Sequence, residues 1–271
     1  MSGTAVSIEG VSKTYGTRTG EIFAVDDVSL TIKDGEFVAL LGPSGCGKST
    51  LMLMMAGLVA RSAGRIVIGG TTVTKPYTDL GIVFQEANLL DWRSVLKNLM
   101  LQIDIRGLNP PPYEKRAREL LKMVGLDGYE DKYPYELSGG MQQRVSICRA
   151  LVHEPPLLLM DEPFGALDAL TRDQLNMDLQ DIWMAKPKTV IFVTHSISEA
   201  VFLSDRIIVM TPRPGKIAAD IRVDLPRPRT LAMRETPEFG AYTKQIRAMF
   251  EEWGVLRTDR NAAAPAMKAA Q

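Results

Sequence analysis

A glycine-rich loop with a lysine and two hydroxyls is the first segment whose residue types could do chemistry. It fits the pattern G-x-x-x-x-G-K-[ST]. Glycines let the backbone curl until consecutive N–H groups point inward, where they can bind phosphate oxygens. Lys48 could reach the β- and γ-phosphates of a nucleoside triphosphate, and Ser49 could ligate Mg²⁺. The full set of predicted phosphate-binding residues is Gly42, Pro43, Ser44, Gly45, Cys46, Gly47, Lys48, Ser49 and Thr50.

Two carboxylates follow a second apolar run, and they could complete such a site. Leu157–Met160 leads directly into Asp161 and Glu162. A carboxylate at the end of a buried strand suits the Mg²⁺ shell, and its neighbour can polarise a water. We therefore assign Asp161 to Mg²⁺, through a water, and Glu162 to the general base. A solvated strand end is the alternative, but the phosphate loop requires such partners.

The elements around these residues alternate between strand and helix. Phe37–Leu41 is a continuous apolar run, typical of a strand covered on both faces, and Lys48–Leu58 has a helical pattern. Later segments repeat the alternation, with strands at Leu157–Asp161, Thr189–Thr194 and Arg206–Thr211 and helices at Ala169–Met184 and Ser196–Leu203. This order predicts an α/β fold: a P-loop NTPase core with a mostly parallel sheet, plus an antiparallel β region near the start.

A helical stretch interrupts the alternation and suggests a division of the chain. Arg93–Val124 has helical spacing broken at Asn109–Pro112, and another helix starts at Ser138 and stops before Pro155. We predict a nucleotide-binding core from 1–85 and 155–225 and a helical subdomain at 86–154. A C-terminal helical extension at 226–256 and a disordered tail at 257–271 complete the prediction.

Composition limits the class of protein. The 271 residues carry 32 Lys and Arg against 32 Asp and Glu, a balance that argues against a nucleic-acid binder. The apolar stretch Leu51–Ala60 is too short to span a membrane, and the first residues do not resemble a signal peptide. We expect a cytoplasmic protein, in which Cys46 and Cys148 are free thiols and Cys46 is selected for its small size.

A third motif narrows the field. LSGGMQQR runs from Leu137 to Arg144, so that Ser138 can cap a helix while Gly139 and Gly140 expose backbone N–H groups to an anion. Together with the phosphate loop and LLLMDEP, it resembles the signature of the ATP-binding cassette (ABC) ATPase family. The resemblance extends from about Val6 to about Leu225 and includes the order of the motifs.

The resemblance implies a site shared by two copies of the chain. In the family, two domains pack head to tail, so Ser138, Gly139, Gly140 and Gln142 would contact the ATP held by the partner copy. Tyr15 in SKTYG would stack on adenine. Gln85, which ends GIVFQ, would sense Mg²⁺ and the attacking water. Asp168 in GALD would communicate across the dimer, and His195 in VTHSISEA would contact the γ-phosphate.

The segment EANLLDWRSVLKNLMLQIDIRG is similar to nitrate/sulfonate/taurine importers, although Asp91 stands where Pro is commoner. The resemblance implies transmembrane permease subunits, an associated substrate-binding protein and a peripheral position at the cytoplasmic face of the inner membrane. Leu89, Leu90, Trp92 and Val95 either line the socket for a permease helix or belong to the core.

Two other readings compete with the importer. A mechanical ABC ATPase acting on DNA or the ribosome would carry a coiled-coil insertion or two cassettes, and the sequence has neither. A regulator without hydrolysis is disfavoured by the presence of Glu162, Gln85 and His195.

Overall fold

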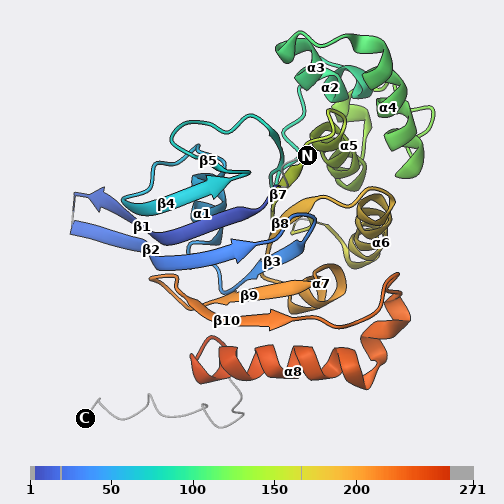
Figure 1. Ribbon diagram of the computed structural model, residues 1–271. Helices are drawn as coiled ribbons and strands as arrows, with labels where there is room; N and C mark the ends of the chain where they lie inside the picture. The colour runs from blue at the N-terminus through green and yellow to red at the C-terminus, as the bar shows by residue number, and fades with distance from the viewer. Residues whose placement is uncertain (1–3, 19, 166, 257–271) are drawn as a thin grey trace, which may run out of the picture.

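The computed structural model describes residues 4–18, 20–165 and 167–256 and contains two β-sheets with helices around them (Figure 1). The larger sheet has the strand order β10-β9-β3-β8-β7-β6. Its strands are β3 (Phe37–Leu41), β6 (Leu80–Val83), β7 (Leu157–Asp161), β8 (Thr189–Thr194), β9 (Arg206–Met210) and β10 (Ile217–Arg222). Neighbouring strands pair in parallel, except that β10 is antiparallel to β9.

The smaller sheet is antiparallel and has the order β2-β1-β4-β5. It consists of β1 (Val6–Thr17), β2 (Gly20–Ile32), β4 (Ala63–Ile68) and β5 (Thr71–Thr72). The parallel sheet with an added antiparallel β region confirms the predicted fold class. The strands β1 and β2 extend well beyond the alternating residues Val28 to Ile32 from which the sequence indicated a strand.

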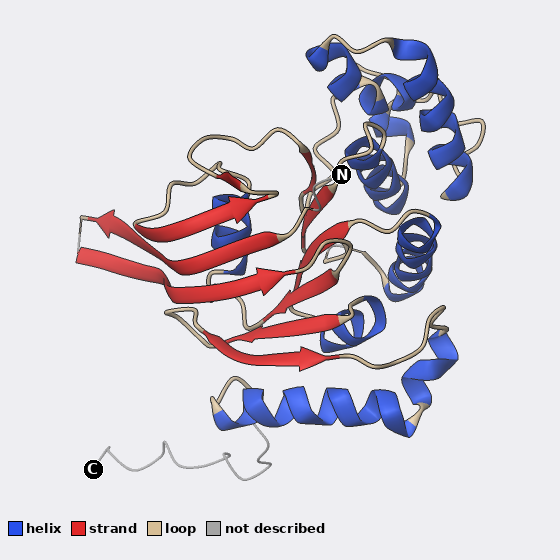
Figure 2. Cartoon of the chain, in the orientation of Figure 1, coloured by secondary structure: helices blue, strands red, loops and turns tan. Residues whose placement is uncertain are grey.

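Strand β3 lies between two hydrophobic cores. Its residues alternate between them: Phe37, Ala39 and Leu41 face one core, and Val38 and Leu40 face the other. The first core contains α5 (Gly139–Leu151), α6 (Ala169–Ala185) and α7 (Ile197–Leu203); the second contains α1 (Lys48–Met55) and the inner face of the antiparallel sheet. Figure 2 shows α1 behind the antiparallel strands, whereas α5, α6 and α7 lie to the right of the strands in this view. Burial on both faces explains why β3 is apolar throughout.

The helical segment between β6 and β7 differs from the prediction in detail. It comprises α2 (Val95–Leu99), α3 (Leu101–Arg106), α4 (Pro110–Met123), the short 3₁₀ turn η1 (Pro134–Glu136) and α5. The break between α3 and α4 lies at residues 107–109, where Gly107 ends α3, and the prolines after Asn109 form the first turn of α4. Proline suits this position because the first N–H groups of a helix have no intrahelical partner anyway.

The C-terminal part wraps back onto the core through η2 (Leu231–Glu235) and α8 (Pro237–Glu252). Phe239, Ile246 and Phe250 bury one stripe of α8 in the core that also contains α7, and Figure 1 shows α8 along the edge beyond β10. The sequence predicted α8 but not β10, because its exposed alternate residues gave a weak apolar pattern. The predicted tail at 257–271 lies outside the described residues.

Two elements near the phosphate loop end earlier than the motifs around them. The helix predicted at Lys48–Leu58 ends at Met55, and strand β6 ends at Val83, two residues before Gln85. Cys46 and Cys148 are both buried and free. Across the described ranges, no helix combines the length and apolar character needed to cross a bilayer.

Candidate functional site

The phosphate loop connects β3 to α1 and is held by its glycines. Gly45 and Gly47 have φ values of +74° and +106°, which side chains rarely tolerate. A Cβ on Gly47 would lie 2.5 Å from the carbonyl oxygen of Ala24, and one on Gly42 would lie 2.9 Å from Sγ of Cys46. The loop therefore curls tightly against β2, and Gly47 cannot be replaced without moving backbone.

Lys48 is folded into this loop. Its side chain is 4% exposed, and Nζ lies 4.0 Å from Oε1 of Glu162. Nζ donates to the carbonyl oxygens of Gly42 at 2.8 Å and Pro43 at 2.9 Å. The ammonium group is thus already desolvated and hydrogen-bonded inside the loop, where a phosphate would offer a stronger, charged acceptor.

Ser49 and Asp161 come together across the sheet. The Ser49 hydroxyl donates to Oδ1 of Asp161 at 2.8 Å, although the two residues are far apart in the chain. Burial raises the pKa of the Asp161 carboxyl, and the hydrogen bond from Ser49 partly opposes that rise. Among the described residues no cluster of three His, Cys, Asp or Glu side chains could hold a metal. One hydroxyl and one carboxylate fit Mg²⁺, which keeps waters and phosphate oxygens as its other ligands.

Glu162, His195 and Gln85 gather at the ends of three neighbouring strands. Nδ1 of His195 lies 2.9 Å from Oε2 of Glu162. Glu162 adopts a φ of +44°, and its N–H donates to the carbonyl oxygen of Val193 at 2.9 Å. A Cβ on Gly165 would lie 3.4 Å from Nε2 of Gln85 and 3.8 Å from Oε2 of Glu162. The strained backbone at Glu162 is typical of positions where a side chain must be aimed at a site.

A groove of about 340 Å³ opens beside the loop, and we call it the Tyr15 groove. The aromatic ring of Tyr15 is 38% exposed, with Nζ of Lys13 4.7 Å from its centroid. The groove is lined by Tyr15, Ile22, Ala24, Ser44, Gly45, Gly47, Lys48, Ser49, Thr50, Glu162 and Arg213. Most of the predicted phosphate-binding residues, the predicted base and the predicted adenine-stacking residue therefore line one groove; Gly42, Pro43 and Cys46 do not line it.

Sequence reasoning missed three of the residues that line the Tyr15 groove: Ile22, Ala24 and Arg213. Ile22 and Ala24 belong to β2, and their alternation along that strand was the available signal. Arg213 lies in the connection between β9 and β10, where only the Pro-rich sequence TPRPG marks a turn.

The signature residues occupy a different hollow. Ser138 caps α5, accepting from the N–H of Met141 at 3.3 Å, and the space beside Gly139 is open. A Cβ on Gly140 would lie 2.6 Å from Cγ2 of Thr171, so α5 packs closely on α6 there. Gly139 and Gln142 line a hollow of about 540 Å³ together with Gln85, away from the Tyr15 groove. Of these two hollows in the described part of the chain, the phosphate loop lines the Tyr15 groove, and Gly139 and Gln142 of the signature line the other.

Gln142 and Asp168, which were predicted to take part in the shared ATP site, already form hydrogen bonds within the single chain. Gln142 folds back, so that Nε2 donates to the carbonyl oxygens of Pro134 at 2.9 Å and Leu137 at 3.3 Å. Asp168 caps α6, where Oδ1 accepts from the N–H of Thr171 at 3.0 Å. Both groups would need an additional or exchanged partner to contact a nucleotide.

The possible permease socket is divided between surface and core. Trp92 is 75% exposed, whereas Val95 is fully buried, so Val95 belongs to the core. Leu89 and Leu90 are half-buried. Asn98, also fully buried, fixes this loop by accepting from the N–H of Leu90 at 2.8 Å and donating to its carbonyl at 3.1 Å.

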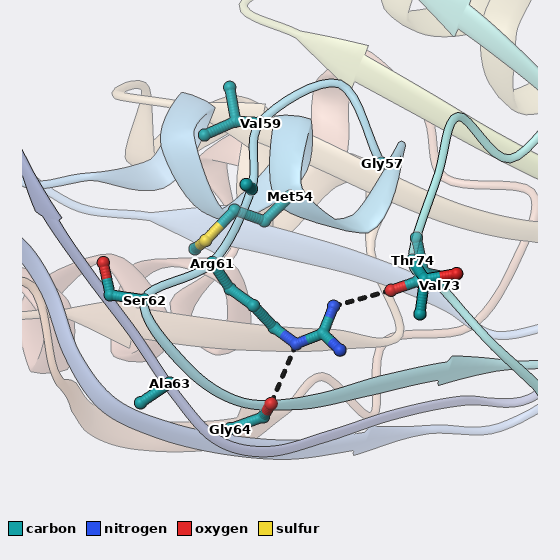
Figure 3. Close-up of a pocket in the computed structure, with 10 residues that line it drawn as sticks. Met54, Gly57, Val59, Arg61, Ser62, Ala63, Gly64, Val73 and Thr74 are labelled. Carbon is teal, nitrogen blue, oxygen red and sulfur yellow. Dashed lines mark hydrogen bonds between the residues drawn. The ribbon is translucent and has the colours of Figure 1, made fainter.

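Another hollow, of about 320 Å³, lies beyond the C-terminal end of α1 (Figure 3). Its one cationic lining residue is Arg61, which donates from Nε to the carbonyl oxygen of Gly64 at 2.8 Å and from Nη1 to that of Val73 at 2.6 Å. The guanidinium thus holds two chain segments together rather than facing a ligand.

Comparisons with known proteins agree with this geometry. The family model described as ABC transporter matches residues 25–165, more than half of the chain. The aliphatic sulfonates import ATP-binding protein SsuB of Bacillus cereus is 43% identical, with 93% of this chain and 98% of that protein covered. The chain belongs to the ABC transporter family. As a member of it, this ABC protein is an ATPase that binds ATP.

Two further relatives extend the comparison. The taurine import ATP-binding protein TauB of Rhizobium johnstonii is 44% identical to this ABC ATPase, covering 93% of the chain and 99% of that protein. A solved structure, the dimeric post-hydrolysis state of an ATP-binding cassette bound to ADP and Pi, has a TM-score of 0.71 at 34% identity. It covers 81% of this chain and 99% of that chain.

Proposed function

We propose that this chain is the ATP-hydrolysing subunit of an importer for substrates of the nitrate, sulfonate or taurine type. The observation that carries the proposal is the gathering of Lys48, Ser49, Asp161 and Glu162 beside one groove, with His195 hydrogen-bonded to Glu162. The similarity to sulfonate and taurine import subunits over 93% of the chain supports the importer class.

The proposed reaction is attack of water on the γ-phosphate. Glu162 accepts a proton from the water, the oxygen of which forms the new P–O bond while the bond to the β-phosphate oxygen breaks. The products are ADP and inorganic phosphate. His195 contacts the γ-phosphate and, through its bond to Glu162, fixes the direction of that carboxylate. Gln85 orients the water from the end of β6.

The loop supplies the electrostatics of this reaction. Lys48 and the backbone N–H groups around Gly45 and Gly47 bind the phosphates and stabilise charge on the transferring group. Ser49 and Asp161 would hold Mg²⁺, directly and through a water respectively. Mg²⁺, when bound there, would neutralise negative charge on the phosphates. Tyr15 stacks on the adenine, an interaction with little preference for the identity of the base.

A second copy of the chain completes the proposed site. Ser138, Gly139, Gly140 and Gln142 would cover the nucleotide bound by the partner copy, with Asp168 at the contact between copies. The dimeric state of the similar cassette supports this arrangement. The dimer would sit at the cytoplasmic face of the membrane beneath permease subunits, which receive solute from a binding protein. We also propose the division into a core at 1–85 and 155–225, a helical subdomain at 86–154 and an extension from 226.

The decisive experiment replaces Glu162 with Gln. We expect the variant to bind ATP with unchanged affinity, to accumulate as a dimer in ATP and to lose at least about a thousandfold in turnover, because a positioned base contributes on the order of 10²–10⁴. ATPase rates and size-exclusion chromatography measure these effects. Turnover at the wild-type rate would show that Glu162 is not the base.

The importer class needs a separate test in cells. Deleting the gene should abolish uptake of labelled taurine, an alkanesulfonate or nitrate, and the wild-type gene, but not the Glu162→Gln form, should restore it. A native membrane preparation should yield a polytopic partner with this chain. Recovery of the chain with ribosomes or DNA alone would instead favour a mechanical ATPase.

A further inference from the structure

The connection between β9 and β10, residues 211–216, is wedged between the phosphate loop and β2; we call it the β9–β10 turn. A Cβ on Gly215 would lie only 2.0 Å from the carbonyl oxygen of Cys46 in the loop. Gly215 also exchanges backbone hydrogen bonds with β2, donating to Ala24 at 3.1 Å and accepting from Asp26 at 3.0 Å. Lys216 pairs with Asp26 at 2.8 Å. The turn therefore has a fixed position beside the loop.

This position places a guanidinium group at the Tyr15 groove. Nε and Nη2 of Arg213 donate to the carbonyl oxygen of Gly45 at 3.2 and 3.1 Å. A guanidinium carries five N–H donors, so these two bonds leave most of its donor capacity unused. Arg213 is exposed and lines the groove, as does the carboxylate Glu162, but within the described ranges Arg213 forms no ion pair.

Two cationic side chains, those of Lys48 and Arg213, line the Tyr15 groove. Lys48 is buried and turned into the loop carbonyls, whereas Arg213 is exposed and rests on a neutral carbonyl at the rim. An arginine fork is well matched to phosphate because it can donate two parallel hydrogen bonds to its oxygens. Since the loop backbone of Gly45 is its anchor, the guanidinium lies within reach of whatever that loop binds.

We propose that Arg213 is a nucleotide-binding residue that contacts the phosphates from the β9–β10 turn, outside the loop motif itself. The inference rests on the proposed function, because it takes the Tyr15 groove as the ATP site. The turn thereby contributes a charged side chain to a site otherwise built from the phosphate loop, the start of α1, β1, β2 and the end of β7.

The test compares Arg213→Ala and Arg213→Lys with a matched control, Arg222→Ala. Arg222 is exposed on β10 and pairs with Asp224, away from the groove. We would measure the Kd values of ADP and ATP with Mg²⁺ by calorimetry at low and high salt, and the unfolding temperature of each protein without nucleotide. Arg213→Ala should weaken ADP binding about tenfold, the size of one charge-assisted hydrogen-bonded contact.

The accompanying readouts separate a phosphate contact from a structural brace. The dependence of Kd on salt should flatten in Arg213→Ala, because one screened charge has been removed, while the unfolding temperature stays within about 1 °C of wild type. Arg213→Lys should keep much of the affinity, and Arg222→Ala should behave as wild type.

Three results would overturn the inference. Unchanged ADP affinity in Arg213→Ala, with wild type binding normally, would contradict it and leave the proposed function intact. A lower unfolding temperature with unchanged affinity and salt dependence would make Arg213 a brace for Gly45 only. Failure of wild type and Arg222→Ala to bind either nucleotide would contradict both this inference and the proposed function.

Discussion

Lys188, which directly precedes β8, is a buried lysine: the residue is only 8% exposed. Burial above all, and then the positive charges of Arg116 and Lys186, lower its pKa from 10.5 to about 8, while Glu154 opposes the shift. His153 also faces this group. Keeping Lys188 charged therefore costs stability at neutral pH, because the unfolded chain would bind its proton more tightly.

Replacing Lys188 with Met should stabilise the protein, by roughly 1–3 kcal/mol at pH 7. Between pH 8 and pH 10.5 the unfolded state binds more protons at this position than the folded state, so the stability of wild type rises with pH in that window. The gain of Lys188→Met should shrink accordingly. Urea unfolding of both proteins at pH 7 and pH 10 measures this.

Lys186→Met is the matched control, since Lys186 is exposed and pairs with Glu154 at 2.8 Å. It should change stability by about 0.5 kcal/mol or less. A gain for Lys188→Met that is equal at both pH values would contradict the account of its burial.

At the scale of residues, the sequence predicted those site groups that lie within local motifs. The phosphate loop and the acidic pair combine particular residue types at fixed spacing, so their proximity to one another at the ends of β3 and β7 follows from the parallel sheet. Arg213 could not be predicted because it reaches Gly45 through the turn beside β2, a contact between segments far apart in the chain. No local sequence pattern predicts such a contact.

Among the elements, the start of the C-terminal extension depends on one buried arginine. Arg229 is 2% exposed and donates to the carbonyl oxygens of Val201 and Ser204 at the end of α7, both at 2.8 Å. Gln180 of α6 bonds both the N–H and the carbonyl of Arg229, at 2.7 and 2.9 Å. Burial lowers the pKa of Arg229 to about 10, so it is still protonated at neutral pH.

Replacing Arg229 with Met should destabilise the protein by roughly 2–4 kcal/mol, because several buried carbonyls lose their donor. The end of α7 and the segment leading to α8 should lose protection from amide hydrogen exchange first. Arg222→Ala, which removes an exposed ion pair, should cost about 0.5 kcal/mol or less. Equal free energies of unfolding for the two variants would contradict this role of Arg229.

The elements also show where sequence patterns were insufficient. The prolines after Asn109 predicted a break, and a break exists, but the same prolines begin α4 because the first turn of a helix needs no N–H donors. Strand β10 was missed because it lies at a sheet edge, where several of its side chains are exposed and the alternation is weak. Buried strands such as β3 and β8 were predicted closely, since both faces require apolar residues.

At the scale of the whole molecule, the Tyr15 groove is separate from the hollow beside Gly139 and Gln142. We therefore expect the complete ATP site to require a second copy of the chain. In a Glu162→Gln background, Ser138→Arg should abolish the ATP-dependent dimer, because a bulky cation would occupy the space beside the helix cap. ATP binding to the monomer should be unchanged, since the Tyr15 groove does not include Ser138. Size-exclusion chromatography and nucleotide titration measure the two effects.

Thr72→Arg, at an exposed position of β5, is the control for an added surface charge and should still dimerise. If the Ser138→Arg variant stays monomeric and also no longer binds ATP, the signature must lie beside the nucleotide of its own chain. If the Ser138→Arg variant still dimerises in ATP, the signature does not lie at the interface between the copies.

The chain between β6 and β7 is longer than the connection of these two strands requires. These two strands are adjacent and parallel, with Leu80 opposite Leu157, so some crossover must join them. Helix α5 already meets that need, packing so closely on β6 that a Cβ on Gly81 would lie 2.3 Å from the carbonyl oxygen of Ala150. The helices α2 to α4 are therefore surplus to the connectivity of the sheet. The length or shape of that excursion can therefore change without altering the register of β6 and β7, whose ends carry Gln85, Asp161 and Glu162.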